Sequence, residues 1–234
     1  MKRRYVLAAL GCAAAAGTAK AQSAAPASTP AARVGEIVSL GNDRFQVGRI
    51  VIDKRGRSFA VAGRVYALGK PLEYLATTPT GRKAYESLLT LDTTGSEFNL
   101  ACILIGLERD PNVPSSRPLT QPGQSVFLSV AWTDAQGQRR QLTAVEALLG
   151  AEAAAKITGV AWAYTGSFTS IDGSQLAADH TGTLIGFVPK DRTGLIEAAR
   201  DMDWGPYGAI RGHAGLPPEG SPIELIVDAA VPKK

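Results

Sequence analysis

Cysteine and histidine are both scarce in this sequence of 234 residues, which contains two of each. Neither His180 nor His213 belongs to an HExxH pattern, and no paired-cysteine spacing occurs, so the usual signs of a zinc site are missing. Carboxylate oxygens leave weaker traces in a sequence, and an oxygen-ligated metal therefore stays open as an alternative. Our expectation is a chain without a bound metal or cofactor.

Common catalytic motifs are missing as well. The sequence has no phosphate loop of the GxGxxG or GxxxxGK[ST] type and no GxSxG nucleophile elbow. Ser167 in "YTGSFTS" is conspicuous, but without an elbow the simpler interpretation is a turn serine that bonds to local backbone. A nucleotide-binding loop and a serine hydrolase of the common type are therefore not expected.

The first 21 residues have the pattern of an export signal. Residues 2–4 are basic, residues 5–16 form an apolar run, and residues 19–21 read Ala-Lys-Ala, the small-x-small pattern of a cleavage site. The apolar run is shorter than the about 20 residues that a membrane-spanning helix needs. We expect a periplasmic or secreted protein with no transmembrane segment after cleavage. Weaker matches to a lipoprotein site at Cys12 and to a twin-arginine signal leave two other export routes open.

Cleavage would also remove the net charge of the chain. The full sequence has 25 Lys and Arg against 21 Asp and Glu, and the leader holds four of the bases and no acid, so the remainder is neutral. A neutral chain without a dense basic run has no field to attract phosphates, and we expect no nucleic-acid partner. It would also keep a single cysteine, so no intramolecular disulfide is predicted.

Residues 22–33, which contain "SAAPASTPAAR", are rich in Ala, Pro, Ser and Thr and predict a flexible linker. Residues 34–234 are long enough for a single domain. Alternating apolar residues around turns predict hairpins over residues 50–65 and 125–142, a strand pair at 72–77 and 85–91, and further strands at 160–165, 181–188 and 223–228. Together these features predict an α+β fold, mainly antiparallel hairpins with a few packed helices.

Three helices are expected among the strands. Thr94 or Ser96 can cap a segment that ends at Gly106, and Thr143 with Glu146 has the spacing of a capping box for residues 144–149. Residues 195–202 are a third candidate. In the first of these helices Cys102 has aliphatic neighbours on every side, so we interpret it as a core residue and not as a nucleophile, which would need partial exposure and a nearby cation.

Two carboxylates stand out as candidates for acid–base chemistry. Glu86 lies in the expected strand 85–91, and Asp179 is followed directly by His180. A carboxylate pair works as acid and base only if burial separates the two pKa values, and adjacent residues on a strand point to opposite faces. The candidates are Glu86, Asp179 and His180 for catalysis, and Tyr85, Asn99, Trp162 and Ser167 for binding.

Five runs between residues 47 and 231 carry a family resemblance: "IVIDKRGRSFAVAGRV", "LEYLATTPTGRKAYESLLTLDTTGSEFNLACILIGL", "VFLSVAWTDAQGQRRQLTAVEALL", "WAYTGSF" with "AADHTGTLIG", and "GSPIELIVD". Together they resemble the YdjY-like domain family of exported bacterial proteins, which has no established activity to carry over. Some relatives bind iron–sulfur clusters through several cysteines, which a single mature cysteine cannot reproduce. The family pattern has histidines where this chain has Tyr85 and Asn99, and it shares Glu86.

Two functions are consistent with these observations. The favoured one is a non-catalytic domain of the cell envelope that binds an unknown protein or small ligand. The alternative is a hydrolase that uses Glu86 and Asp179, with or without a divalent metal. A pocket that brought Glu86, Asn99 and Asp179 within hydrogen-bonding reach would favour the hydrolase.

Overall fold

The computed structural model describes residues 36–108, 124–156, 162–166, 176–187, 194–198 and 209–229. The predicted signal peptide, the predicted linker and Ser167 lie outside these ranges.

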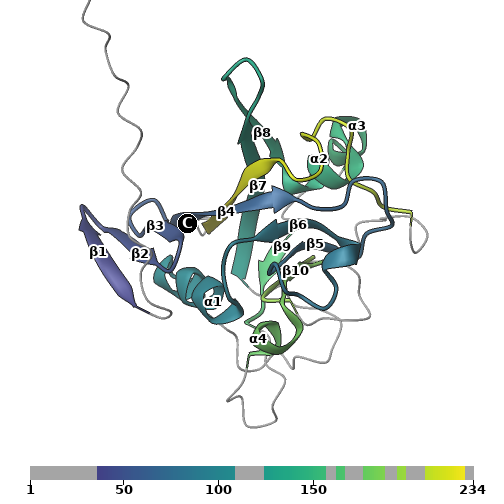
Figure 1. Cartoon of the computed structure of the whole chain (residues 1–234). Coiled ribbons are helices and arrows are strands. Elements are labelled where there is room, and N and C mark those ends of the chain that lie inside the picture. Colours follow the sequence, from purple (N-terminus) through teal and green to yellow (C-terminus); the bar gives the residue numbers. More distant parts are fainter. Residues whose placement is uncertain are drawn as a thin grey trace, which may run out of the picture. The chain divides into compact units, whose positions relative to one another are not determined.

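A closed barrel of eight strands forms the centre of the described structure (Figure 1). The strands follow one another in the order β4–β12–β7–β9–β11–β10–β5–β6, and β6 pairs with β4 to close the ring. Two neighbouring pairs, β10–β11 and β5–β6, are parallel, and the others are antiparallel. The bounds are β4 (Ser58–Val65), β12 (Pro222–Ala229), β7 (Gln124–Thr133), β9 (Trp162–Tyr164), β11 (Ile196–Ala198), β10 (Thr183–Gly186), β5 (Tyr74–Thr77) and β6 (Ser87–Leu91).

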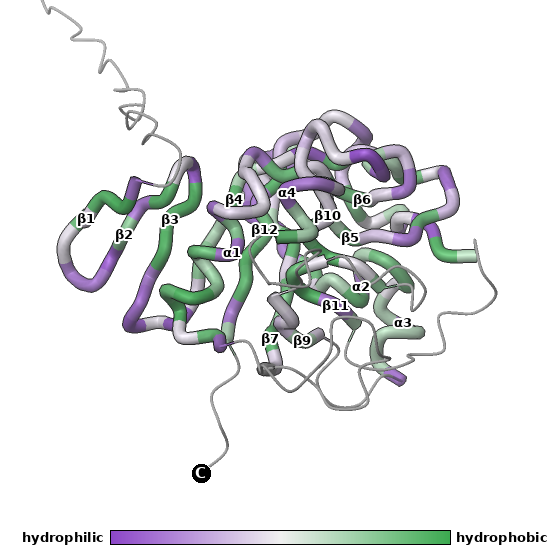
Figure 2. Tube along the Cα trace, turned by 90° about the horizontal axis from the view of Figure 1, so that it is seen from below, coloured by the Kyte–Doolittle hydropathy of each residue, from purple (hydrophilic) through white to green (hydrophobic). Residues whose placement is uncertain are grey.

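Four more strands extend the sheet beyond the ring. β3 (Ile50–Asp53) pairs with the start of β4, and β2 (Arg44–Val47) and β1 (Ile37–Gly41) follow it outward, on the left in Figure 1. The turn between β1 and β2 is hydrophilic (Figure 2), and its Asn42 and Asp43 have positive φ of 52° and 59°, which such short polar residues tolerate. β8 (Arg139–Thr143) pairs with the end of β7.

Two strands of the barrel have a forked edge. β12 runs along one edge of β4, while the other edge pairs first with β3, through residues 58–60, and then with β6, through residues 63–65. In the same way β12 runs along one edge of β7, while β9 and then β8 share the other edge. Each fork leaves a gap in the sheet that other parts of the chain have to fill.

The helices of the described residues are short: η1 (Ala84–Glu86), α1 (Gly95–Leu104), α2 (Ala144–Leu149), α3 (Ala151–Ala154) and α4 (Ala177–Thr181). The expected capping box of Thr143 and Glu146 at the start of α2 is confirmed. Of the two expected caps for α1, Thr94 is the N-cap, and it also forms a capping box with Glu97. α1 lies beside β2 and β3 (Figure 1), and its Phe98 packs edge-to-face on Phe59 of β4 with ring centroids 5.2 Å apart.

The predicted α+β class is wrong, because the structure is mostly β and is organised by closure of the sheet. The hairpins β3–β4 and β7–β8 are confirmed, and so are strands within residues 160–165, 181–188 and 223–228. The second strand pair differs, because β5 and β6 are parallel. A parallel pair needs a crossover connection, and η1 forms part of it, so Glu86 lies in this 3₁₀ turn and not in a strand.

The expected helix at residues 195–202 is also wrong in the described part. Residues 196–198 form β11, which is a strand of the ring, paired with β9 on one side and β10 on the other, and is buried at every position. A short strand that is buried on both faces, here with a buried Glu197 at its centre, has no solvent-facing alternation and cannot be told from a buried helix by periodicity alone.

The interior of the barrel and the space under α1 form one continuous apolar core. Cys102 belongs to this core with no exposed surface, which confirms its interpretation as a packing residue. Burial raises the pKa of its thiol far above the ordinary value, because the thiolate would lose its hydration.

Candidate binding site: a pocket at the fork of β7

The fork of β7 lies at Phe127 and Leu128, between the residues that pair with β9 and those that pair with β8. On this edge β9 pairs with β7 up to Val126, opposite Trp162, and β8 pairs with it from Ser129, opposite Thr143. β8 and β9 diverge there, and α2 and α3 follow β8 on the way to β9. In contrast to the fork of β4, where α1 packs, this fork contains a pocket.

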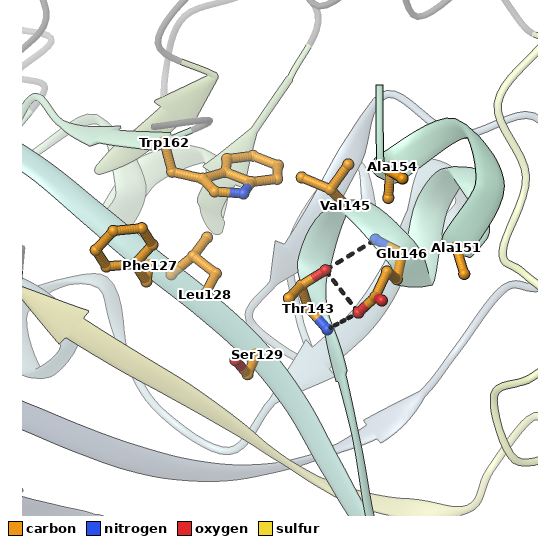
Figure 3. Close-up of a pocket in the computed structure, with 10 residues that line it drawn as sticks. Phe127, Leu128, Ser129, Thr143, Val145, Glu146, Ala151, Ala154 and Trp162 are labelled. Atoms are coloured by element: carbon orange, nitrogen blue, oxygen red, sulfur yellow. Dashed lines mark hydrogen bonds between the residues drawn. The ribbon is translucent and has the colours of Figure 1, made fainter. Parts of the chain in front are cut away.

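The pocket has a volume of about 310 Å³ and a mainly apolar lining. Phe127, Leu128 and Trp162 lie on the strand side, and Val145 and Ala154 face them from α2 and α3 (Figure 3). The lining is completed by Ser129, Thr143, Glu146, Ala151 and Ala155. A concave, mainly apolar site with a few polar groups is a common arrangement for binding small ligands.

Phe127 is the exposed aromatic residue of this site. It has 52% of its surface exposed, whereas Trp162 has 2% and Leu128 has 3%. Exposure of such a ring leaves apolar surface in water, and a ligand that covers it would recover that free energy, at about 25 cal/mol per Å². The pocket therefore combines a buried aromatic floor with an exposed aromatic residue.

Glu146 places a carboxylate at the pocket through the capping box of α2. Its Oε2 atom accepts hydrogen bonds from the backbone N–H of Thr143 at 2.7 Å and from the Thr143 hydroxyl at 2.8 Å, and Thr143 Oγ1 in turn accepts from the backbone N–H of Glu146 at 3.2 Å. These bonds, drawn as dashed lines in Figure 3, fix the carboxylate beside the apolar lining.

A second pocket, of about 390 Å³, lies at the turn between β7 and β8, where Trp132, Pro217 and Pro218 form part of the lining. Its charged group, Asp134, is already paired with Arg140 at 2.7 Å. The hydrogen bond from Arg140 holds the pKa of the Asp134 carboxyl below its usual value. We regard the fork pocket as the stronger candidate, because its aromatic residue is exposed and its carboxylate has no such cation among the residues that the structure describes.

Glu86, Asn99 and Asp179 each have a different partner in the structure. Glu86 accepts a hydrogen bond from Lys83 Nζ at 2.9 Å, and this bond raises the pKa of the Lys83 ammonium. Asn99 Oδ1 accepts from the Tyr164 hydroxyl at 2.6 Å. Asp179 accepts from the Ser96 backbone N–H at 2.8 Å and from the Ser96 hydroxyl. Within the described ranges no hydrogen bond joins any two of the three candidates.

The other candidates lie in separate places. Tyr85 is 51% exposed, with Lys83 Nζ 5.6 Å from its ring centroid, and His180 is exposed on α4. Asp179 and His180 are therefore neighbours on a short helix and not on a strand. Of the candidate catalytic and binding residues that the structure describes, Trp162 alone lines the fork pocket. The capping box of α2, which also contributes to the lining, was predicted only as a helix cap.

Sequence reasoning missed most of the fork pocket. One signal was present in β7, where Ser125, Phe127 and Ser129 alternate with three buried apolar residues. A single exposed aromatic residue is common on a protein surface, so this signal points to an interaction site only once the pocket beside it is known. The convergence of α2, α3 and β9 on this position depends on long-range pairing and has no local signal.

Comparison of the chain with family models, curated proteins and solved structures finds no match. In the part of the chain that the structure describes, none of the helices is long and apolar enough to cross a membrane. The same residues contain no group of three or more His, Cys, Asp or Glu side chains placed to hold a metal ion.

Proposed function

We propose that the chain is a non-catalytic binding module of the cell envelope and that its ligand occupies the fork pocket of β7. The observation that carries this proposal is the pocket itself, where the exposed ring of Phe127 adjoins a mainly apolar cavity of about 310 Å³. Export rests on the predicted signal over residues 1–21 and on the resemblance to the YdjY-like family, whose members are exported.

The geometry of Glu86 and Asp179 lends the alternative hydrolase no support. A carboxylate that acts as acid or base has to reach the reacting atoms from a shared site. Asp179 instead bonds to Ser96 in the first turn of α1, and Glu86 pairs with Lys83, three residues before it in the chain. These bonds favour structural roles for both side chains.

Closing the pocket with one side chain tests the proposal. Ala154 and Ala153 are neighbours on α3 with similar partial exposure, but only Ala154 lines the pocket. Ala154→Phe should fill the cavity, and Ala153→Phe is the matched control. The probe is 2-phenylethanol, a neutral molecule with one aromatic ring, and its binding is measured by ligand-observed NMR on protein isolated from the envelope fraction, where the predicted cleavage gives an N-terminus at Gln22.

We expect the wild type and Ala153→Phe to bind the probe and Ala154→Phe to lose at least about tenfold in affinity, since a filled apolar site costs the ligand most of its burial. Equal binding by the two variants would show that the probe binds elsewhere. Absence of binding to the wild type would contradict the proposed site.

A further inference from the structure

The fork pocket has a charge that the other described residues of its lining do not balance. Ten described residues line it, and Glu146 is the charged one among them. Its Oε2 atom takes both bonds from Thr143, and Oε1 accepts no hydrogen bond from any described residue. The donors that bond to this carboxylate are neutral groups and bring no positive charge to it.

Some carboxylates of the described chain are paired with cations: Glu86 with Lys83, Glu152 with Lys156 and Glu224 with Arg139. Others, such as Asp179, accept hydrogen bonds from neutral donors as Glu146 does, but Asp179 does not line the fork pocket. Glu146 has no Lys or Arg within ion-pair distance in the ranges that the structure covers. A carboxylate fixed beside apolar surface without a cation is complementary to a ligand that brings one.

The opposite side of the pocket suits the same kind of ligand. Figure 3 shows Trp162 and Phe127 across the cavity from Glu146. The faces of aromatic rings carry partial negative charge and attract ammonium groups, and they also cover apolar carbon. A molecule with an ammonium group and an apolar body would therefore find both of its parts matched.

We propose that the fork pocket binds small organic amines in their cationic form, with Glu146 as the counter-ion and Phe127 and Trp162 as the apolar contacts. This inference rests on the proposed function, because it names the ligand class of the same site. The volume of about 310 Å³ suits a small molecule with one ring or a short aliphatic chain.

Charge-matched probes of similar shape test the inference. 2-Phenylethylammonium, 2-phenylethanol and phenylacetate carry one aromatic ring and differ in charge from positive through neutral to negative. Their dissociation constants are measured by NMR titration of the full mature protein. An ion pair with a partly exposed carboxylate contributes a factor of up to about fivefold, so we expect the cation to bind about fivefold more tightly than the alcohol and the anion to bind most weakly.

Glu146→Gln removes the charge and keeps the cap, because Gln also serves at this position of a capping box. The variant should fold like the wild type, which thermal unfolding checks, and should bind the cation and the alcohol within about twofold of each other. Glu152→Gln is the matched control. It removes a negative charge from α3 at a side chain that is 94% exposed and does not line the pocket, and it should leave the preference for the cation unchanged.

The outcomes separate the inference from the proposed function. If all three probes bind equally, or if Glu146→Gln keeps the preference, the amine inference is wrong while the pocket still binds apolar molecules. If none of the probes binds, the pocket is not a binding site and both proposals fail. Nα-acetyl-lysine amide tests a lysine of a partner protein as the source of the cation, and tighter binding of this probe than of 2-phenylethylammonium would contradict a small amine.

Discussion

The thiol of Cys102 lies on α1 with no exposed surface, and burial raises its pKa. The thiolate is the form that reacts with alkylating reagents, so both access and ionisation protect this residue. We expect no labelling of Cys102 by iodoacetamide in the native protein and complete labelling in denaturant, with the labelled peptide identified by mass spectrometry.

Ser39→Cys provides the control for this experiment, because Ser39 is exposed on β1 and its replacement should react at once under native conditions. Prompt native labelling of Cys102 itself would show that α1 opens readily and that the sulfur is accessible for chemistry.

At the scale of single residues, the sequence predicted what depends on near neighbours. The aliphatic run around Cys102 and the spacing between Thr143 and Glu146 are local patterns, and the structure confirms both. The partner of Asp179 could not be predicted, because Ser96 lies 83 residues away in the sequence and a carboxylate that caps a distant helix leaves no local sequence pattern.

At the scale of elements, α1 is held at its two ends by residues from other parts of the chain. The Asp179 carboxylate accepts from Ser96 at the N-terminal end, and the Arg57 guanidinium donates to the carbonyl of Ile105 at 3.2 Å at the C-terminal end. A negative charge at the start of a helix and a positive charge at its end both interact favourably with the helix dipole. These contacts help to fix the helix that fills the fork of β4.

Asp179→Ala should therefore lower the free energy of unfolding by about 1 kcal/mol, the usual contribution of a side chain that caps a helix. Asp179→Asn keeps an oxygen for the Ser96 N–H and should lose less. Urea unfolding measures both variants. The neighbouring exposed residue supplies the control, since His180→Ala should stay within about 0.5 kcal/mol of the wild type. If the Asp179→Ala protein were as stable as the wild type, the Asp179 carboxylate would not stabilise α1 as a cap, and another role for it would have to be considered.

The elements also show where sequence patterns stop being informative. Strands with one exposed face, such as β4 and β12, alternate clearly and were predicted close to their observed bounds. β11 is buried on both faces and was mistaken for a helix. The strand pair at 72–77 and 85–91 was predicted, but its parallel direction, as β5 and β6, has no signal in the sequence.

At the scale of the whole barrel, closure depends on the pairing of β4 with β6, which no local sequence pattern predicts. Gly63 lies at this seam, paired with Leu91 of β6 on one side and Ile223 of β12 on the other. A Cβ atom at Gly63 would lie 2.3 Å from the carbonyl oxygen of Thr90, a backbone atom that cannot move away without shifting the strand. The glycine therefore allows the two strands to approach closely enough to pair.

Gly63→Ala should open this seam and lower the free energy of unfolding by about 1–3 kcal/mol, the range for an added carbon in a closely packed interior. Gly69→Ala is the matched control, because Gly69 is exposed, has no positive φ and has open space where the Cβ would be. It should change stability by no more than about 0.5 kcal/mol. Urea unfolding of the two variants measures the difference. Equal stability would show that β4 and β6 can separate at little cost, and the ring would then be held by its other pairs.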